Sequence, residues 1–207
     1  IADYDDFTQT DANGDTERWD TGYIANVDGS AAGTEGGSAD INTIRARVQI
    51  NPDATPTRAA YAIKRDEPSY SRYFTFVVDA TVILNAAQAT STLSGLRIAR
   101  GDVDSATNFV SVAREASTTV NRITAIARFN NVAQTTVNFS TTDNAVAFKI
   151  ERYANVWNCF YSLTQYPNWQ WVKFAQFEDA SGNMSSTTSC YLFSESGGTA
   201  TTQTAVA

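Results

Sequence analysis

The sequence has 207 residues, of which 43% are hydrophobic and 18% charged, and its formal net charge is −7. This length and apolar content predict a single domain, residues 1–207, with its own core. The acidic balance and the lack of a long basic run exclude nucleic acid as an expected partner, and no apolar run reaches membrane-spanning length. The chain has no histidine, which excludes Ser-His-Asp and Cys-His catalysis and a histidine zinc site.

The N-terminal part of the chain is polar. Residues 1–7 form a short strand pattern, and residues 8–43, rich in Gly, Ala, Asp, Thr and Ser, predict a long polar loop. Early in this loop, oxygen-bearing side chains occupy alternate positions, a spacing that resembles a calcium loop. Four residues would supply the ligands: Asp11, Asn13, Asp15 and Glu17.

A regular EF-hand is nevertheless excluded. Counting from Asp11, Thr16 stands where the motif needs Gly, and Gly22 stands where it needs a bidentate Glu. Two interpretations stay open, an irregular Ca²⁺ site and an Asx-rich surface turn that satisfies its own backbone groups.

The middle of the chain alternates between apolar and polar residues. The clearest case is 73–84, where Phe74, Phe76 and Val78 begin one continuous apolar face. Six further segments have the same period and predict strands: 44–50, 59–64, 93–100, 109–114, 122–129 and 135–139.

Residues 145–177 contain three alternating runs separated by two short polar breaks, which predicts three successive antiparallel strands. In the first run, Val146, Phe148 and Ile150 share a face. In the third, we expect Trp169, Trp171 and Phe177 to share a face with Lys173.

The chain ends with a strand pattern at 190–194 and a weakly structured tail, 195–207, with a strand candidate at 201–206. No segment has helical periodicity. With about eleven short strands, the sequence predicts an all-β fold, a sandwich of two antiparallel sheets of the jelly-roll type.

Several motifs resemble the concanavalin A-like lectin/glucanase sandwiches, the laminin-G-like group. The central hairpins carry Arg152, then Phe160-Tyr161-Ser162, then Trp171, similar to the "R…fyyS…W" pattern of that group. Asp5-Asp6-Phe7 with Trp19 is similar to its opening strand, and the run 190–194 to a late strand. The resemblance implies the sandwich fold, which hosts lectins, glycosidases, lyases and structural modules.

The resemblance also sets an expectation about catalysis. Glucanases of this fold cluster acidic residues along one strand as E-x-D-x-x-E, and no such cluster occurs here, because Glu151 and Asp79 are each alone in their strands. The histidine-dependent motifs of related lyases are also absent. We therefore expect that the chain is not an enzyme.

Aromatic and polar residues around the central hairpins are the candidates for sugar binding, since pyranose rings stack on exposed aromatic rings. The alternative is that large aromatics such as Phe160 and Trp171 belong to the core, with Trp169 at its rim. The candidates are Arg152, Trp157, Tyr161, Tyr166, Asn168 and Trp169.

The two cysteines, Cys159 and Cys190, both fall in strand patterns. We expect a disulfide between them, which would close a long loop and add about 3 kcal/mol. The alternative is two buried free thiols.

These observations favour a non-catalytic, lectin-like module of an extracellular or virion surface, which binds a glycan or cell-surface polymer. Ca²⁺ is the candidate cofactor. The alternative function is a structural subunit of a fibre, filament or capsid that self-associates through its termini, because an unfilled sheet edge invites pairing with another chain.

Overall fold

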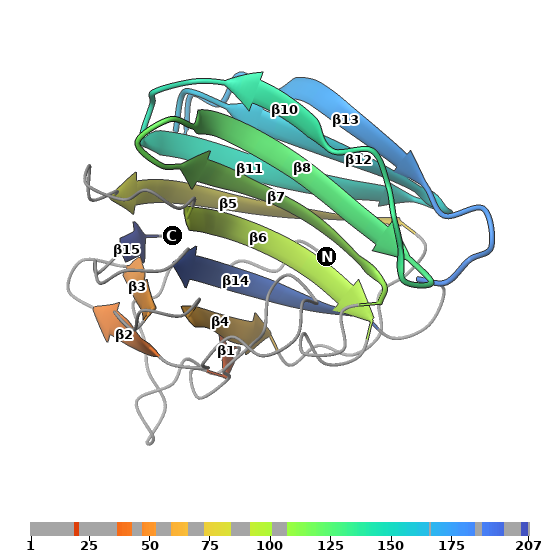
Figure 1. The fold of residues 1–207 in the computed structure, drawn as a ribbon, viewed down its shortest axis with the longest axis horizontal. Coiled ribbons are helices and arrows are strands. Elements are labelled where there is room, and N and C mark those ends of the chain that lie inside the picture. The colour runs from red at the N-terminus through yellow and green to blue at the C-terminus, as the bar shows by residue number, and fades with distance from the viewer. Residues whose placement is uncertain are drawn as a thin grey trace.

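The computed structural model describes residues 19–20, 37–42, 47–52, 59–65, 73–83, 92–100, 107–165, 167–184, 188–196 and 204–206. Within these ranges the chain forms fifteen β-strands and no helix, as shown in Figure 1. The described residues therefore include no helix that is long and apolar enough to cross a membrane.

Eight of these strands form one antiparallel sheet, here called sheet A. Strand β9 (Val132–Ala133) pairs only with β8 and stands off the main order. The other strands follow one another across the sheet as β1 (Trp19–Asp20), β4 (Ala59–Arg65), β14 (Thr188–Ser196), β6 (Thr92–Arg100), β7 (Phe109–Ala116), β8 (Asn121–Phe129) and β10 (Val137–Ser140).

The remaining seven strands form sheet B, which is also antiparallel. Its C-terminal strand β15 pairs on one side with β5 and on the other with β3. The order across the sheet is β13 (Val172–Glu178), β12 (Val156–Ser162), β11 (Ala145–Tyr153), β5 (Tyr73–Ile83), β15 (Thr204–Val206), β3 (Arg47–Pro52) and β2 (Gly37–Asn42).

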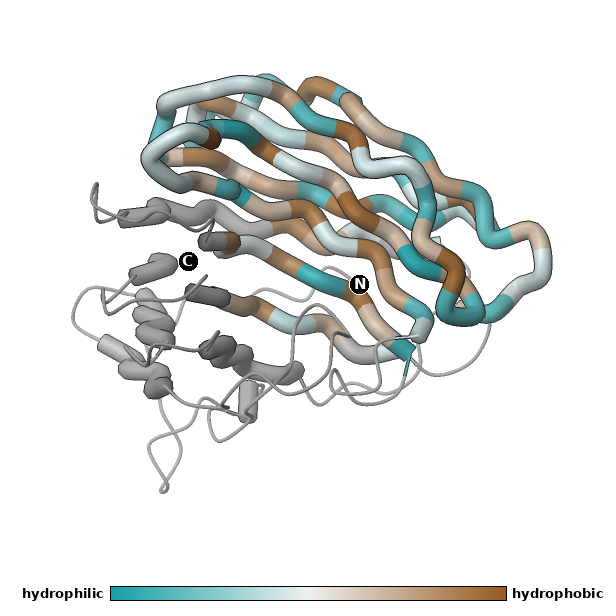
Figure 2. The backbone as a smooth tube through the Cα atoms, viewed as in Figure 1, coloured by the Kyte–Doolittle hydropathy of each residue, from teal (hydrophilic) through white to brown (hydrophobic). Residues whose placement is uncertain are grey.

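The two sheets pack face to face, which confirms the predicted all-β sandwich. Strand β7 of sheet A contacts β11 and β12 of sheet B, and β8 passes in front of β11 in Figure 1. Hydropathy alternates along most of the described strands (Figure 2), because successive side chains point to opposite faces.

The main core lies between the sheets. Val146, Phe148 and Ile150 of β11 share the inward face, as their spacing predicts, and each is fully buried. Burial of such side chains contributes about 1.5–3 kcal/mol each. Strands of both sheets supply the other large members of this core: Leu96, Ile98, Val110, Val112, Ile123, Phe129, Trp157, Tyr161, Phe177, Met184 and Leu192.

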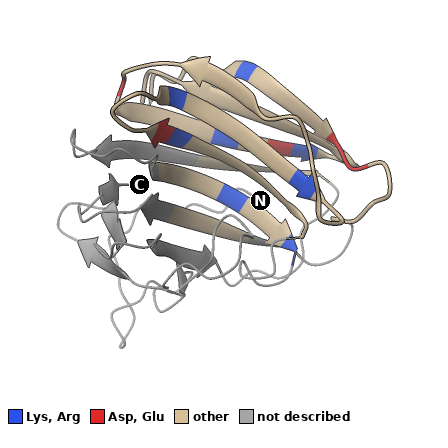
Figure 3. Ribbon diagram, viewed as in Figure 1, with Lys and Arg blue, Asp and Glu red and all other residues tan. Residues whose placement is uncertain are grey.

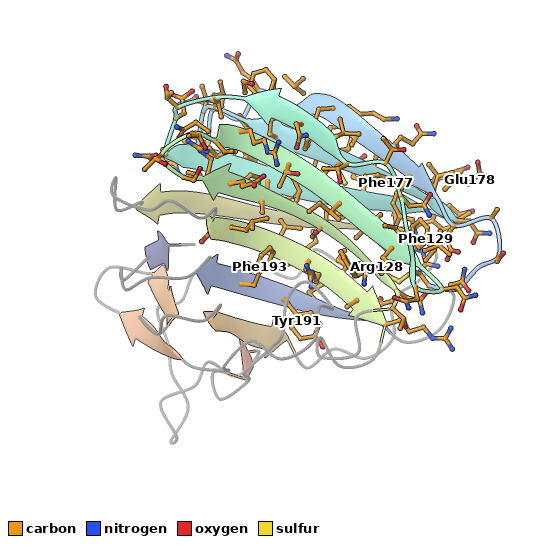
Figure 4. All side chains as sticks on the ribbon, viewed as in Figure 1. Arg128, Phe129, Phe177, Glu178, Tyr191 and Phe193 are labelled. Carbon is orange, nitrogen blue, oxygen red and sulfur yellow. The ribbon has the colours of Figure 1, made fainter. Side chains whose placement is uncertain are left out.

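A second buried cluster lies on the opposite, outer face of sheet A. Tyr191 and Phe193 of β14, both visible in Figure 4, pack there with Phe109 of β7. The guanidinium carbon of Arg97 lies 4.0 Å from the centre of the Phe109 ring and 5.2 Å from that of Phe193. Arg97 is only 3% exposed. Basic residues lie on β6, β7 and β8 in Figure 3, and all of them are arginines.

Strands β6 and β7 approach closely at Gly95, which pairs in register with Ala113. A Cβ atom at position 95 would clash with the backbone carbonyl oxygen of Val112 and crowd Ala113. Glycine is therefore required there by the backbone of the neighbouring strand.

The predicted loop 8–43 contains strands, because it includes β1 and all of β2. In the tail 195–207, β14 continues to Ser196, and β15 falls within the predicted strand candidate 201–206. Strand β15 pairs with β3 and β5 of its own sheet. Residues 1–7 themselves lie outside the described residues.

Candidate functional site on the outer face of sheet B

The outer face of sheet B is solvent-accessible and arranged in rows. Strands β5, β11, β12 and β13 pair in a register that aligns their outward residues across the sheet. Because neighbouring strands lie about 4.8 Å apart, four aligned residues extend roughly 14 Å. One row, here called the polar row, consists of Thr75, Glu151, Asn158 and Gln176. The adjacent row, here called the lysine row, consists of Val77, Lys149, Phe160 and Lys173.

Each lysine of the lysine row donates a hydrogen bond to a side chain of the polar row. Lys149 donates from Nζ to Oε1 of Glu151 at 2.7 Å, and Lys173 donates to Oε1 of Gln176 at 2.6 Å. These two bonds bracket Asn158, whose strand lies between those of Glu151 and Gln176. The amide oxygen of Asn158 is buried and accepts no hydrogen bond.

Lys149 also contacts two aromatic rings. Its Nζ lies 4.1 Å from the centre of the Phe160 ring and 5.0 Å from that of Trp171. Both distances are within the range of a cation–π interaction. The ammonium group therefore joins the acidic Glu151 to an aromatic surface on the same face.

Two aromatic pairs stand at the two ends of this arrangement. Tyr73 and Tyr153 are partners in register, with ring centres 4.8 Å apart in an edge-to-face geometry and exposures of 55% and 66%. Near the lysine row, Trp169 and Trp171 have ring centres 5.3 Å apart. The face therefore has hydrogen-bonding groups between two patches of aromatic surface, the combination that binds amphipathic sugar rings.

The segment that carries the tryptophans is held by side-chain hydrogen bonds. Ser162, at the end of β12, donates to the carbonyl oxygen of Thr164 at 2.6 Å and accepts from the backbone N–H of Gln170 at 2.9 Å. Thr164 in turn donates to the carbonyl oxygen of Asn168 at 2.6 Å. These bonds fix the turn on both sides of Trp169. Such local Ser/Thr bonds are typical of turns, so the S-x-T spacing was an available signal.

A β-bulge corrects the predicted face of the third central strand. The register of β12 and β13 shifts between Cys159 and Phe160, so Cys159 pairs with Ala175 while Phe160 pairs with Lys173. Lys173 consequently points outward and is exposed, whereas Phe177 is 6% exposed in the core. The expectation that these two residues share a face is therefore wrong, because a bulge changes the phase of the alternation.

Three of the predicted sugar-binding residues do not belong to the exposed face. Trp157 is fully buried, Tyr161 is 6% exposed and Arg152 is 5% exposed. Arg152 donates from Nε to the carbonyl oxygen of Ala154, and its guanidinium lies 4.8 Å from the Trp157 ring centre. Trp157 and Tyr161 take the inward side of β12, so Phe160 and Asn158 take the outward side.

The other predicted contacts stay predictions. Asn168 is exposed and Trp169 half-buried in the turn between β12 and β13, and Tyr166 lies outside the described residues. The alternation Lys149-x-Glu151-x-Tyr153 carried the signal for the residues that were missed, because every second residue of a strand faces the same way.

The predicted disulfide is absent: neither Cys159 nor Cys190 is disulfide-bonded, and both are buried. Cys159 lies on β12, which packs against β7, whereas Cys190 lies on β14, two strands away from β7 in sheet A. Two strand spacings place the two backbones about 9.6 Å apart across the sheets. The Cα atoms of a disulfide are at most about 6.8 Å apart.

The predicted calcium ligands Asp11, Asn13, Asp15 and Glu17 lie outside the described residues. Within the described ranges, no group of three acidic or cysteine side chains could hold a metal ion. Calcium binding therefore stays a prediction, and a fall in melting temperature on adding EDTA would test it.

Comparison with solved structures identifies proteins that share this fold. No family profile and no curated protein matches the sequence. Among solved structures, the GH43 protein BlXynB of Bacillus licheniformis shares the fold with a TM-score of 0.67 at 13% identity, over 98% of this chain and 37% of that one. The chain thus spans little more than a third of that protein.

Two further structures match over most of both chains. A Bacillus licheniformis β-glucanase has a TM-score of 0.61 at 10% identity, over 94% of this chain and 91% of its own. The VIP36 exoplasmic/lumenal domain, in its Ca²⁺-bound form, has a TM-score of 0.57 at 8% identity, over 98% and 86%. These likenesses confirm the concanavalin A-like sandwich fold that the sequence motifs indicated.

The same comparison contradicts the expectation that the chain is not an enzyme. Its fold is shared by a β-glucanase and a GH43 protein. The expectation relied on missing histidines and a missing acidic motif. Glycosidic bonds, however, are cleaved by carboxylic acids without histidine. Glu151 is a carboxylate on the exposed face, so a lack of histidine does not settle the question.

Proposed function

We propose that this chain binds a glycan on the outer face of sheet B. The observation that carries the proposal is the polar row between two aromatic pairs, Tyr73 with Tyr153 and Trp169 with Trp171. Aromatic faces contact the apolar side of a sugar ring, while amide, carboxylate and ammonium groups bind its hydroxyls. The β-glucanase that shares the fold supports a carbohydrate-related role.

A binding measurement with matched variants tests the proposal. The probes are barley mixed-linkage β-glucan, xylan and chitotetraose, measured by affinity electrophoresis or calorimetry. Trp171→Ala should weaken binding at least about tenfold, because it removes an aromatic contact in the proposed site. The control is Val132→Ala, since Val132 is an apolar residue, 61% exposed, on sheet A and outside the proposed site. Equal affinity of wild type and Trp171→Ala for a bound probe would contradict the proposal.

A second candidate function, glycoside hydrolysis at the same face, is favoured by the neighbours and by the position of Glu151. The same incubations are assayed for released reducing ends. Turnover that disappears in Glu151→Gln, with binding retained, would assign Glu151 as a catalytic carboxylate. Turnover that persists in Glu151→Gln would remove Glu151 from that role.

A further inference from the structure

Asn158 has an unusual position in the proposed glycan site. Its neighbours across β11 and β13 in the polar row, Glu151 and Gln176, are both engaged by lysines. Its own amide oxygen is buried and accepts no hydrogen bond. The residue as a whole is half-buried, on the same face as the exposed Gln176.

A buried acceptor without a donor destabilises the folded state, because the group has lost its hydrogen bonds to water and gained none. Most buried polar groups in native proteins have partners, and exceptions concentrate at sites that act on a ligand. Asn is also a poor residue for a strand interior, where β-branched residues are favoured. Nothing in the local fold of β12 therefore requires Asn at this position.

We propose that Asn158 is a specificity-determining residue of the glycan site, whose amide oxygen accepts a hydrogen bond from a hydroxyl or an acetamido N–H of the bound sugar. This inference rests on the proposed function and identifies one contact within it. Gln176, the exposed partner of Asn158 on β13, is held by one hydrogen bond from Lys173, so a sugar hydroxyl would reach the oxygen once that bond breaks and the side chain moves aside. Ligands with a donor at this point bind better than analogues without one, because only they satisfy the orphan oxygen.

The proposal makes stability and binding change in opposite directions. Asn158→Val removes the orphan acceptor and inserts a good strand former, so the melting temperature should rise by about 3 °C. The same variant should weaken binding of barley β-glucan or chitotetraose at least about tenfold, since the accepting group is lost. The β-glucan offers only hydroxyl donors and chitotetraose also offers acetamido N–H groups, so the probe affected more identifies the donor.

Asn138→Val is the matched control. Asn138 is exposed on β10 of sheet A, so this change makes the same gain in strand propensity away from the site. It should leave binding unchanged and raise the melting temperature less than Asn158→Val does.

The outcomes separate this proposal from the proposed function. A melting temperature of Asn158→Val at or below that of Asn138→Val would show that the oxygen has a structural partner, which overturns the proposal. Unchanged affinity in Asn158→Val, with loss in Trp171→Ala, would overturn the role of Asn158 but retain the glycan site. Unchanged affinity in both variants would overturn the glycan site itself.

Discussion

The two outer faces of the sandwich combine cations and aromatic rings, with the rings buried to different degrees. On sheet A, Arg97 lies against Phe109 and Phe193 and is 3% exposed. On sheet B, Lys149 lies against Phe160 and Trp171, two half-buried rings, and its own side chain is 13% exposed. The same pattern therefore belongs to a packed cluster on one face and to the proposed glycan site on the other. The two faces differ in the burial of the aromatic rings rather than in residue type.

The largest effect is expected for Phe109→Ala, in the buried cluster on the outer face of sheet A. Removing a buried aromatic side chain leaves a cavity and should lower the free energy of unfolding by about 3–5 kcal/mol. Urea denaturation measures the change. A loss under about 1 kcal/mol would mean that the outer face of sheet A is not a packed second core.

The next largest effect is expected from Cys159, which lies in the core between the two sheets. Burial raises the pKa of the Cys159 thiol above its ordinary value. Above about pH 8.5, the unfolded chain therefore loses this proton while the folded protein keeps it, and stability falls by up to about 1.4 kcal/mol per pH unit. Denaturation curves of wild type and Cys159→Ala at several alkaline pH values measure the difference in slope. Identical slopes would contradict the burial of this thiol.

A smaller effect is expected for Lys149→Met on the exposed face. The variant loses the ion pair with Glu151, whose side chain is 35% exposed, and the contact with Phe160, at a cost of about 1 kcal/mol. Because salt screens exposed ion pairs, the cost should shrink at high ionic strength. Lys173→Met, which removes a lysine without an ion pair, serves as control. A cost that is independent of salt would show that packing dominates.

The smallest stability effect is expected for Tyr153→Ala. Its ring contacts Tyr73 edge-to-face but stays largely in water, so the loss should be about 0.5 kcal/mol. Affinity for β-glucan should nevertheless fall, since the ring is part of the proposed site. Thermal unfolding and calorimetry on one sample measure both, and a large loss of stability would remove the contrast with Phe109.

Much of the fold follows from local alternation. The three central strands, the long strand β5 and the inward face of Val146, Phe148 and Ile150 were all predicted from a period of two. Alternation gives no sign of a single inserted residue, however. The bulge beside Cys159 therefore reversed the expected side of Lys173 relative to Phe177.

The site was harder to predict than the fold, for a physical reason. In β12, Trp157 and Tyr161 alternate with Asn158 and Phe160, and both sets contain large aromatics. Alternation shows which residues share a side but not which side faces the opposite sheet. The pairing of Tyr73 with Tyr153 was equally hidden, because it joins strands that are far apart in the sequence.

The position of β15 has a consequence for the order in which the protein can assemble during synthesis. Thr204 pairs with Ile83 of β5, and Ala205 pairs with Ile50 of β3, so three late residues lie between two strands made much earlier. Before they leave the ribosome, β2 and β3 have no neighbour in sheet B linking them to β5. The nascent chain therefore cannot complete this sheet until Val206 has been synthesised and has left the ribosome.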